Sequence, residues 1–105
     1  MAVIEVTSAE QFEEVLRTNA KVAVEFTATW CGPGRLIGPV FKQLSEQYRN
    51  IVFLSVDVDK VAPVAQQYSI RAMPTFLFFK DGDRSDDITG ANKVGLEDKA
   101  KMWAA

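Results

Sequence analysis

The sequence contains one cysteine, Cys31, and no histidine. A single thiol cannot form a disulfide within the chain. Without histidine, neither a zinc site of cysteine and histidine ligands nor a cysteine–histidine catalytic pair can be built. We therefore expect no metal site and no cofactor, and any thiol chemistry must use one cysteine at a time.

Two kinds of segment that would indicate particular partners are also missing. No run of lysine or arginine is long enough to follow a phosphate backbone, and the formal net charge is only -2, which argues against a nucleic-acid partner. No stretch approaches the roughly 20 apolar residues that span a bilayer, and residues 1–5 resemble no targeting segment. We expect a cytoplasmic protein with neither nucleic-acid nor membrane partners.

The composition that is present is that of a globular domain. Of the 105 residues, 48% are hydrophobic and 25% are charged, a balance that favours a folded chain over a disordered one. A chain of this length has enough residues for one hydrophobic core but not for two. We therefore predict a single domain over residues 1–105.

Apolar periodicity and turn residues predict nine elements. Strands are expected at 3–6, 22–27, 51–57, 75–80 and 83–89, and helices at 8–18, 36–48, 59–68 and 92–103. The order β-α-β-α-β-α-β-β-α predicts an α/β fold with a mixed five-stranded sheet flanked by four helices, some on each face.

Several residues fix the details of these predicted elements. Ser8 and Asp59 are expected to cap the first and third helices, and Asp81-Gly82 indicates a hairpin turn. Leu36 and Val94 are assigned to the apolar, buried faces of the second and fourth helices.

Cys31 lies where a strand ends and a helix begins, in the segment Trp30-Cys31-Gly32-Pro33-Gly34. Unpaired N–H groups and the positive end of the helix dipole at this position favour a thiolate, and Arg35 adds positive charge nearby. The position therefore suits a nucleophilic thiol. The alternative interpretation is an inert buried cysteine, because free cysteine is often simply packed in a core.

The segment around Cys31 resembles the active site of the thioredoxin family, and the resemblance covers nearly the whole chain. Further similar blocks stand in the same order at 22–27, before this segment, and at 53–59, 72–76 and 90–93, after it, with spacing like that of the cytosolic eukaryotic members. The resemblance implies the thioredoxin fold and thiol–disulfide exchange with proteins that carry disulfides or reactive cysteines.

The resemblance also implies a groove for an extended substrate peptide beside Cys31. Its walls would be Trp30, Gly32 and Pro33, the turn Met73-Pro74-Thr75 with a cis Pro74, and the loop Gly90-Ala91. Glu25 stands where the family usually has a buried aspartate used for proton transfer. A strand-end carboxylate that is paired or reaches solvent is the other interpretation of Glu25.

One departure from the family pattern decides the expected mechanism. Gly34 occupies the position of the second cysteine, which in the family expels the substrate by intramolecular attack. We therefore predict an oxidoreductase limited to a monothiol mechanism. A mixed disulfide at Cys31 would persist until glutathione, as a co-substrate, or another external thiol attacks it.

Other functions stay open at this point. The domain could be a redox-inactive peptide-binding module, or a form of a dithiol protein in which Gly34 traps mixed disulfides. The chain could be a monomer or a dimer linked through Cys31, and two chains could share an iron–sulfur cluster through one Cys31 each.

Overall fold

The computed structural model describes residues 3–105, and its strands and helices alternate except for two consecutive strands before the last helix. The strands are β1 (Val3–Glu5), β2 (Lys21–Thr27), β3 (Val52–Asp57), β4 (Thr75–Lys80) and β5 (Asp83–Thr89). The helices are α1 (Ala9–Thr18), α2 (Gly32–Gln47), α3 (Ala62–Gln67) and α4 (Lys93–Ala104). The order predicted from the sequence is confirmed. The first two residues of the predicted domain range lie outside the described residues.

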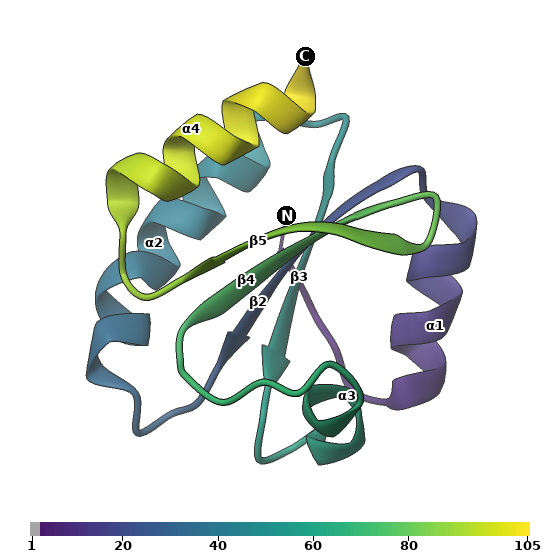
Figure 1. Ribbon diagram of the computed structural model, residues 1–105, viewed down its shortest axis with the longest axis vertical. Helices are drawn as coiled ribbons and strands as arrows, with labels where there is room; N and C mark the ends of the chain where they lie inside the picture. Colours follow the sequence, from purple (N-terminus) through teal and green to yellow (C-terminus); the bar gives the residue numbers. More distant parts are fainter. Residues whose placement is uncertain (1–2) are drawn as a thin grey trace.

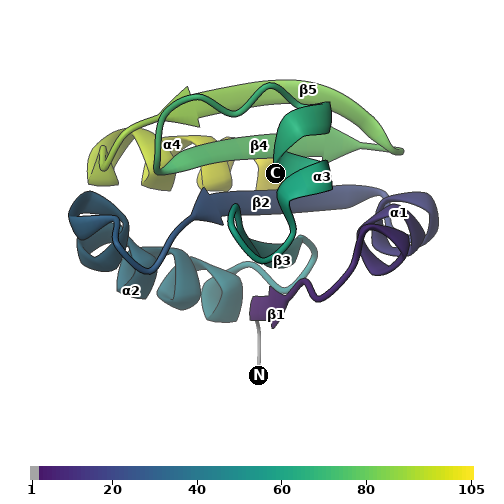
Figure 2. The same ribbon diagram turned by 90° about the horizontal axis from the view of Figure 1, so that it is seen from below.

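The strands form one mixed sheet in the order β1-β3-β2-β4-β5. Strands β1, β3 and β2 run parallel to one another, whereas β4 and β5 are antiparallel to their neighbours. Figure 2 shows that the end of β2, the start of β4 and the β5–α4 connection all lie at the left-hand end of the sheet. The residues that follow or precede these strand ends therefore meet at one edge.

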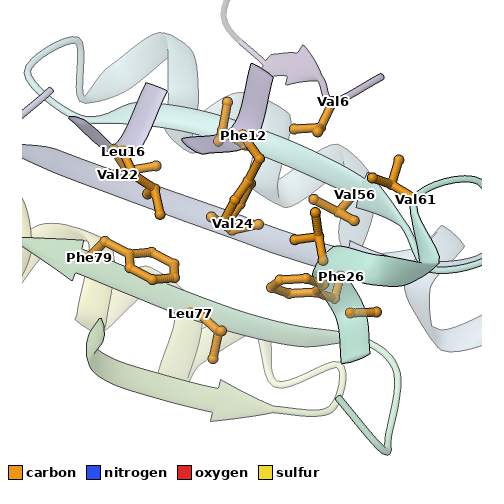
Figure 3. Packing of buried hydrophobic residues seen from close by; sticks show 13 residues of the cluster. Val6, Phe12, Leu16, Val22, Val24, Phe26, Val56, Val61, Leu77 and Phe79 are labelled. Atoms are coloured by element: carbon orange, nitrogen blue, oxygen red, sulfur yellow. The ribbon is translucent and has the colours of Figure 1, made fainter. Parts of the chain in front are cut away.

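Helices cover both faces of the sheet, with α1 and α3 on one side and α2 and α4 on the other (Figure 1). Successive side chains of β2 point to opposite faces. Val24 and Phe26 join Phe12 of α1 in one buried cluster (Figure 3), whereas Ala23 belongs to the cluster beneath α2 and α4. By the same alternation Glu25 faces α2 and α4, beside its register partner Ser55 of β3.

Helix capping follows the predictions at α1 but not at α3. The Ser8 hydroxyl accepts a hydrogen bond from the amide of Gln11 at 3.1 Å, as expected for an N-cap. The predicted cap at Asp59 is wrong, because α3 begins later, after Val61, and no side chain caps it. Two amides in the turn before α3, those of Asp59 and Lys60, are bound instead by the carboxylate of Asp57.

The prediction that Leu36 and Val94 are buried is also wrong. Leu36 is 78% exposed and Val94 is 66% exposed. In α2 the buried face follows Gly34, Ile37 and Phe41, and Leu36 lies on its flank because successive helix residues are about 100° apart. Apolar side chains near the N-termini of both helices are therefore in contact with solvent.

Candidate functional site

Cys31 is the N-cap of α2, four residues beyond the end of β2. Its backbone N–H donates to the carbonyl of Ala28 at 3.0 Å, which closes the turn that brings the chain from the strand into the helix. The sulfur then accepts a hydrogen bond from the amide of Gly34 at 3.2 Å. A free helix N–H is thus directed at Sγ, and such a donor favours negative charge on the sulfur.

The thiol is largely covered although its neighbour is not. Cys31 is 4% exposed, whereas Trp30 is 65% exposed. The indole Nε1–H of Trp30 donates to the carboxylate of Asp59 at 2.9 Å, and the guanidinium of Arg35 donates to the Thr29 carbonyl at 2.9 Å. These two hydrogen bonds connect the loop before α2 to the turn after β3 and to the first turn of α2.

Gly34 is packed directly against the sulfur of Cys31. A Cβ atom placed on Gly34 would lie 3.1 Å from Cys31 Sγ, 3.5 Å from Cys31 Cβ and 2.5 Å from Thr27 Oγ1. Disulfide-bonded cysteines have Cβ atoms about 3.5–4.5 Å apart. The backbone at residue 34 is therefore placed for a disulfide with Cys31, although the residue there has no side chain.

Glu25 is a buried acid without a hydrogen-bond partner at one of its oxygens. The residue is 5% exposed, and its Oε2 atom contacts no donor within the described residues. Burial raises the pKa of Glu25 from its ordinary 4.5 to about 7, because removal from water disfavours the charged form. Within the described residues the carboxylate of Glu25 therefore has no ion-pair partner, and its Oε2 atom has no contact with solvent.

Two segments of the expected groove, the turn before β4 and the loop before α4, meet at the edge of the sheet where β2 ends. Phe26 of β2 lies opposite Thr75, the first residue of β4. The peptide bond between Met73 and Pro74 is cis. The amide of Gly90 donates to the carbonyl of Pro74 at 2.8 Å, which ties the loop before α4 to the turn before β4.

Sequence reasoning missed three residues that line a cleft behind Cys31. Thr27, Gly38 and Ser55 border this cleft together with Glu25 and Gly34, and the hollow nearest Cys31 encloses about 300 Å³. Two signals in the sequence could have indicated it. Gly38 follows Gly34 by one helical turn, and Ser55 is a polar residue inside an apolar strand.

Metal ligands and membrane-spanning helices were searched for in the same residues, 3–105. No group of three or more histidine, cysteine, aspartate or glutamate side chains in this range is placed to hold a metal ion. Nor is any helix in this part of the chain both long enough and apolar enough to cross a bilayer.

The mixed sheet, its flanking helices and a cysteine at the N-terminus of α2 define a protein of the thioredoxin-fold class. The Thioredoxin family model matches residues 2–102. The chain is 52% identical to a thioredoxin H-type of Picea mariana over 90% of this chain and 76% of that one. It is 47% identical to a thioredoxin of Equus caballus over 89% and 90% of the respective chains. The chain belongs to the thioredoxin family.

The fold agrees with solved structures of the family. A structure of Plasmodium falciparum thioredoxin superposes with a TM-score of 0.94 at 37% sequence identity, covering 95% of this chain and 98% of that one. Thioredoxins are small redox proteins that act on disulfide-bearing proteins and work without a bound cofactor. The chain is therefore a redox protein of this family, and Cys31 is its one cysteine.

Proposed function

We propose that this protein is a monothiol thioredoxin that captures disulfides through Cys31. The Cys31 thiolate attacks one sulfur of a protein disulfide or of oxidised glutathione. A bond forms between Cys31 Sγ and that sulfur, the original disulfide breaks, and the other sulfur leaves as a thiolate that takes up a proton. The product is a mixed disulfide, and the chain has no second cysteine to resolve it.

The observation that carries this proposal is the pair formed by Cys31 and Gly34. The amide of Gly34 donates to Cys31 Sγ, so the helix end that supports a thiolate is retained. At the same position the family's resolving cysteine is absent, because residue 34 is glycine. These two features support capture of a disulfide by Cys31 and leave release of the substrate to an external thiol such as glutathione. We place the protein in the reducing cytoplasm, where glutathione is abundant.

The proposed substrate surface is the sheet edge beside Cys31. The exposed indole of Trp30 would form one wall, Gly32 and Pro33 would lie beside it, and the turn Met73-Pro74-Thr75 would form the facing wall. Gly90 and Ala91 would close one end, because Gly90 is hydrogen-bonded to Pro74. Glu25 is proposed as the group that exchanges protons with the reacting sulfur.

The test is incubation of the reduced protein with oxidised glutathione, followed by intact mass and peptide mapping. We expect the mass to rise by one glutathionyl group located on Cys31, and the Cys31→Ser variant to stay unmodified. An unreacted thiol would contradict the proposal. A mass of two chains joined by one disulfide would instead indicate the dimer linked through Cys31.

The low exposure of Cys31 favours one second candidate, a peptide-binding module that no longer turns over. The thiol of a cysteine that is only 4% exposed reacts slowly when the loop around it stays closed. In that case partners isolated with the protein should be retained by Cys31→Ser. Partners of a monothiol reductant should be lost with the thiol, because they are held by the covalent bond.

A further inference from the structure

A small polar hollow lies beside the turn before β4. It is formed between the edge strand β5 and the connection from α3 to β4, and Figure 2 shows this connection running along β5. The hollow encloses about 200 Å³, whereas sites for whole small molecules are about 300–1,000 Å³. It therefore suits one side chain of a larger partner better than a separate ligand.

The hollow adjoins a wall of the proposed peptide groove. Ala72 and Thr75 border the hollow, and they stand on either side of Met73-Pro74, the turn that we propose as a wall of the groove. Thr75 also lies opposite Thr89 of β5, which borders the hollow as well. An extended peptide advances about 3.3 Å per residue. A substrate peptide passing along this turn would therefore bring a side chain to the hollow within a few residues of its captured cysteine.

A β-bulge directs Arg84 into the hollow. Arg84 and Asp87 are three residues apart, so in a regular strand their side chains would point to opposite faces of the sheet. In β5, however, residues 86 and 84 lie opposite the consecutive residues Phe78 and Phe79, and Ser85 is an extra residue without a partner on β4. The bulge turns Arg84 onto the face of Asp87, and both residues border the hollow.

The hollow contains two guanidinium groups and one carboxylate. Arg71 borders it from the connection before β4, and Arg84 and Asp87 border it from β5. Arg84 is 3.4 Å from Asp87, and the two side chains are 44% and 56% exposed, so this ion pair contributes little. Arg71 belongs to none of the ion pairs formed by residues 3–105. The hollow therefore has positive charge available for an acidic side chain of a partner.

We propose that this hollow is a subsite of the peptide groove that receives an aspartate or glutamate side chain of the substrate protein. This inference rests on the proposed monothiol function and adds a preference for disulfides close to acidic residues. Arg71 and Arg84 would donate hydrogen bonds to the carboxylate, the group that guanidinium donors match best. The attack by Cys31 is unchanged, so the subsite raises the rate of capture through binding alone.

The experiment uses cysteine peptides whose sulfur is joined to a chromogenic aromatic thiol. Cys31 Sγ bonds to the peptide sulfur, and the aromatic sulfur leaves as a coloured thiolate because it has the lower pKa. Matched peptides carry glutamate or glutamine, in turn, at each of the nearest positions on both sides of the cysteine. For at least one position we expect the glutamate peptide to react about fivefold faster at low salt, as for two exposed charge pairs.

The ratio of the two rates tests the two arginines, because a general loss of structure slows both peptides alike. Arg71→Gln and Arg84→Gln should each lower the ratio to about two, and the double variant should lower it to about one. Arg49→Gln is the control, since it removes the same charge from an exposed turn after α2. The 16 residues of α2 place this turn about 24 Å from Cys31, well beyond the Debye length of about 10 Å. The control should keep the fivefold ratio.

Two further variants should increase or reverse the preference. Asp87→Asn removes the carboxylate that competes for Arg84, so the ratio should rise to about ten. Replacing both arginines, with Arg71→Glu and Arg84→Glu together, should make a lysine peptide react faster than the glutamine peptide. Neither result is expected if the arginines only stabilise the fold, and both keep the inference falsifiable should a glutamine variant fold poorly.

The outcomes separate the two proposals. If no peptide forms an adduct at Cys31, the monothiol function is wrong and the subsite inference is wrong with it. If the glutamate and glutamine peptides react equally fast at every position, the subsite inference is overturned and the monothiol function stands. The same holds if the double glutamine variant keeps the preference, or if Arg49→Gln abolishes it.

Discussion

At residue 34, the backbone is placed for a disulfide that glycine, which has no side chain, cannot form. The Cβ position is 3.5 Å from Cys31 Cβ, within the range of about 3.5–4.5 Å found in disulfides. We therefore predict that Gly34→Cys forms a disulfide with Cys31 once Thr27 Oγ1 rotates away. In a single turnover with a disulfide substrate, the reduced variant should release both substrate thiols, whereas the chain with Gly34 should stop at the mixed disulfide.

Gly34→Ser is the matched control, because it adds a side chain of similar size without a thiol. It should behave like the natural chain and stop at the mixed disulfide. Intact mass and thiol titration after the turnover distinguish the products. If Gly34→Cys kept a covalent substrate as long as Gly34→Ser does, the backbone at residue 34 would not be placed for a disulfide.

The burial of Glu25 makes a prediction for stability against pH. Its pKa is raised by burial from 4.5 in the unfolded chain to about 7 in the fold. The folded state therefore holds this proton when the unfolded state has lost it. The stabilising contribution is complete below about pH 4.5 and is lost as the pH rises through about 7, with a difference of about 3 kcal/mol.

The amide side chain of the Glu25→Gln variant has no proton to lose. The free energy of unfolding of this variant should therefore not show the decrease with rising pH that Glu25 causes. Chemical denaturation of both proteins between pH 4 and about 8.5 measures the difference, and other ionisable groups cancel in it. The variant should gain about 3 kcal/mol relative to the natural chain over this range. A constant difference would mean that Glu25 is ionised in the fold at pH 5.

At the scale of elements, the sequence predicts the structure correctly where apolar periodicity and turn residues indicate the same element boundaries. Strand β4 and the Asp81-Gly82 turn are predicted correctly, because φ values of 50° and 85° at the turn suit aspartate and glycine. The start of α3 is predicted wrongly. Asp59 has the sequence signature of a helix cap, but its carboxylate accepts a hydrogen bond from the Trp30 indole instead. Residue type alone does not distinguish these two hydrogen bonds.

Loss of the Asp59 side chain should affect stability less than loss of a side chain that caps a helix. Since its carboxylate caps no helix, we predict that Asp59→Ala changes the free energy of unfolding by less than about 0.5 kcal/mol. Asn92→Ala removes a true cap, whose side chain accepts from the amide of Gly95 at 2.9 Å, and should cost about 1 kcal/mol. Denaturant titration compares the two, and equal losses would mean that the hydrogen bond between Trp30 and Asp59 stabilises the fold as much as a helix cap does.

Across the whole molecule, the position of Cys31 could be predicted from the sequence, but the space around it could not. A helix N-terminus is a local feature, signalled by the Gly/Pro turn. The cleft behind the thiol depends on which side chains β1, β3 and α2 direct toward one another, and on Gly38 in particular. These contacts join residues distant in sequence. They follow from strand order and register, which no local pattern specifies.

The strand order also decides how the two faces of the sheet are coupled. Strand β2 contributes Val24 and Phe26 to the cluster with α1 and Ala23 to the cluster with α2 and α4, so neither cluster can loosen without disturbing the strand they share. We therefore predict that the domain unfolds in one cooperative transition. A Trp30→Phe background leaves Trp103 of α4, stacked on Phe78, as the fluorescent reporter of one face.

Phe12→Leu perturbs the opposite face, where Phe12 is fully buried against α3 and β4, and should cost about 1–2 kcal/mol. If the two faces unfold together, the transition of Trp103 fluorescence must shift to lower denaturant by as much as the transition of the far-ultraviolet circular dichroism. A Trp103 transition that stayed in place while the dichroism shifted would show that each face unfolds alone. The single cooperative domain predicted from the length of the chain would then be wrong.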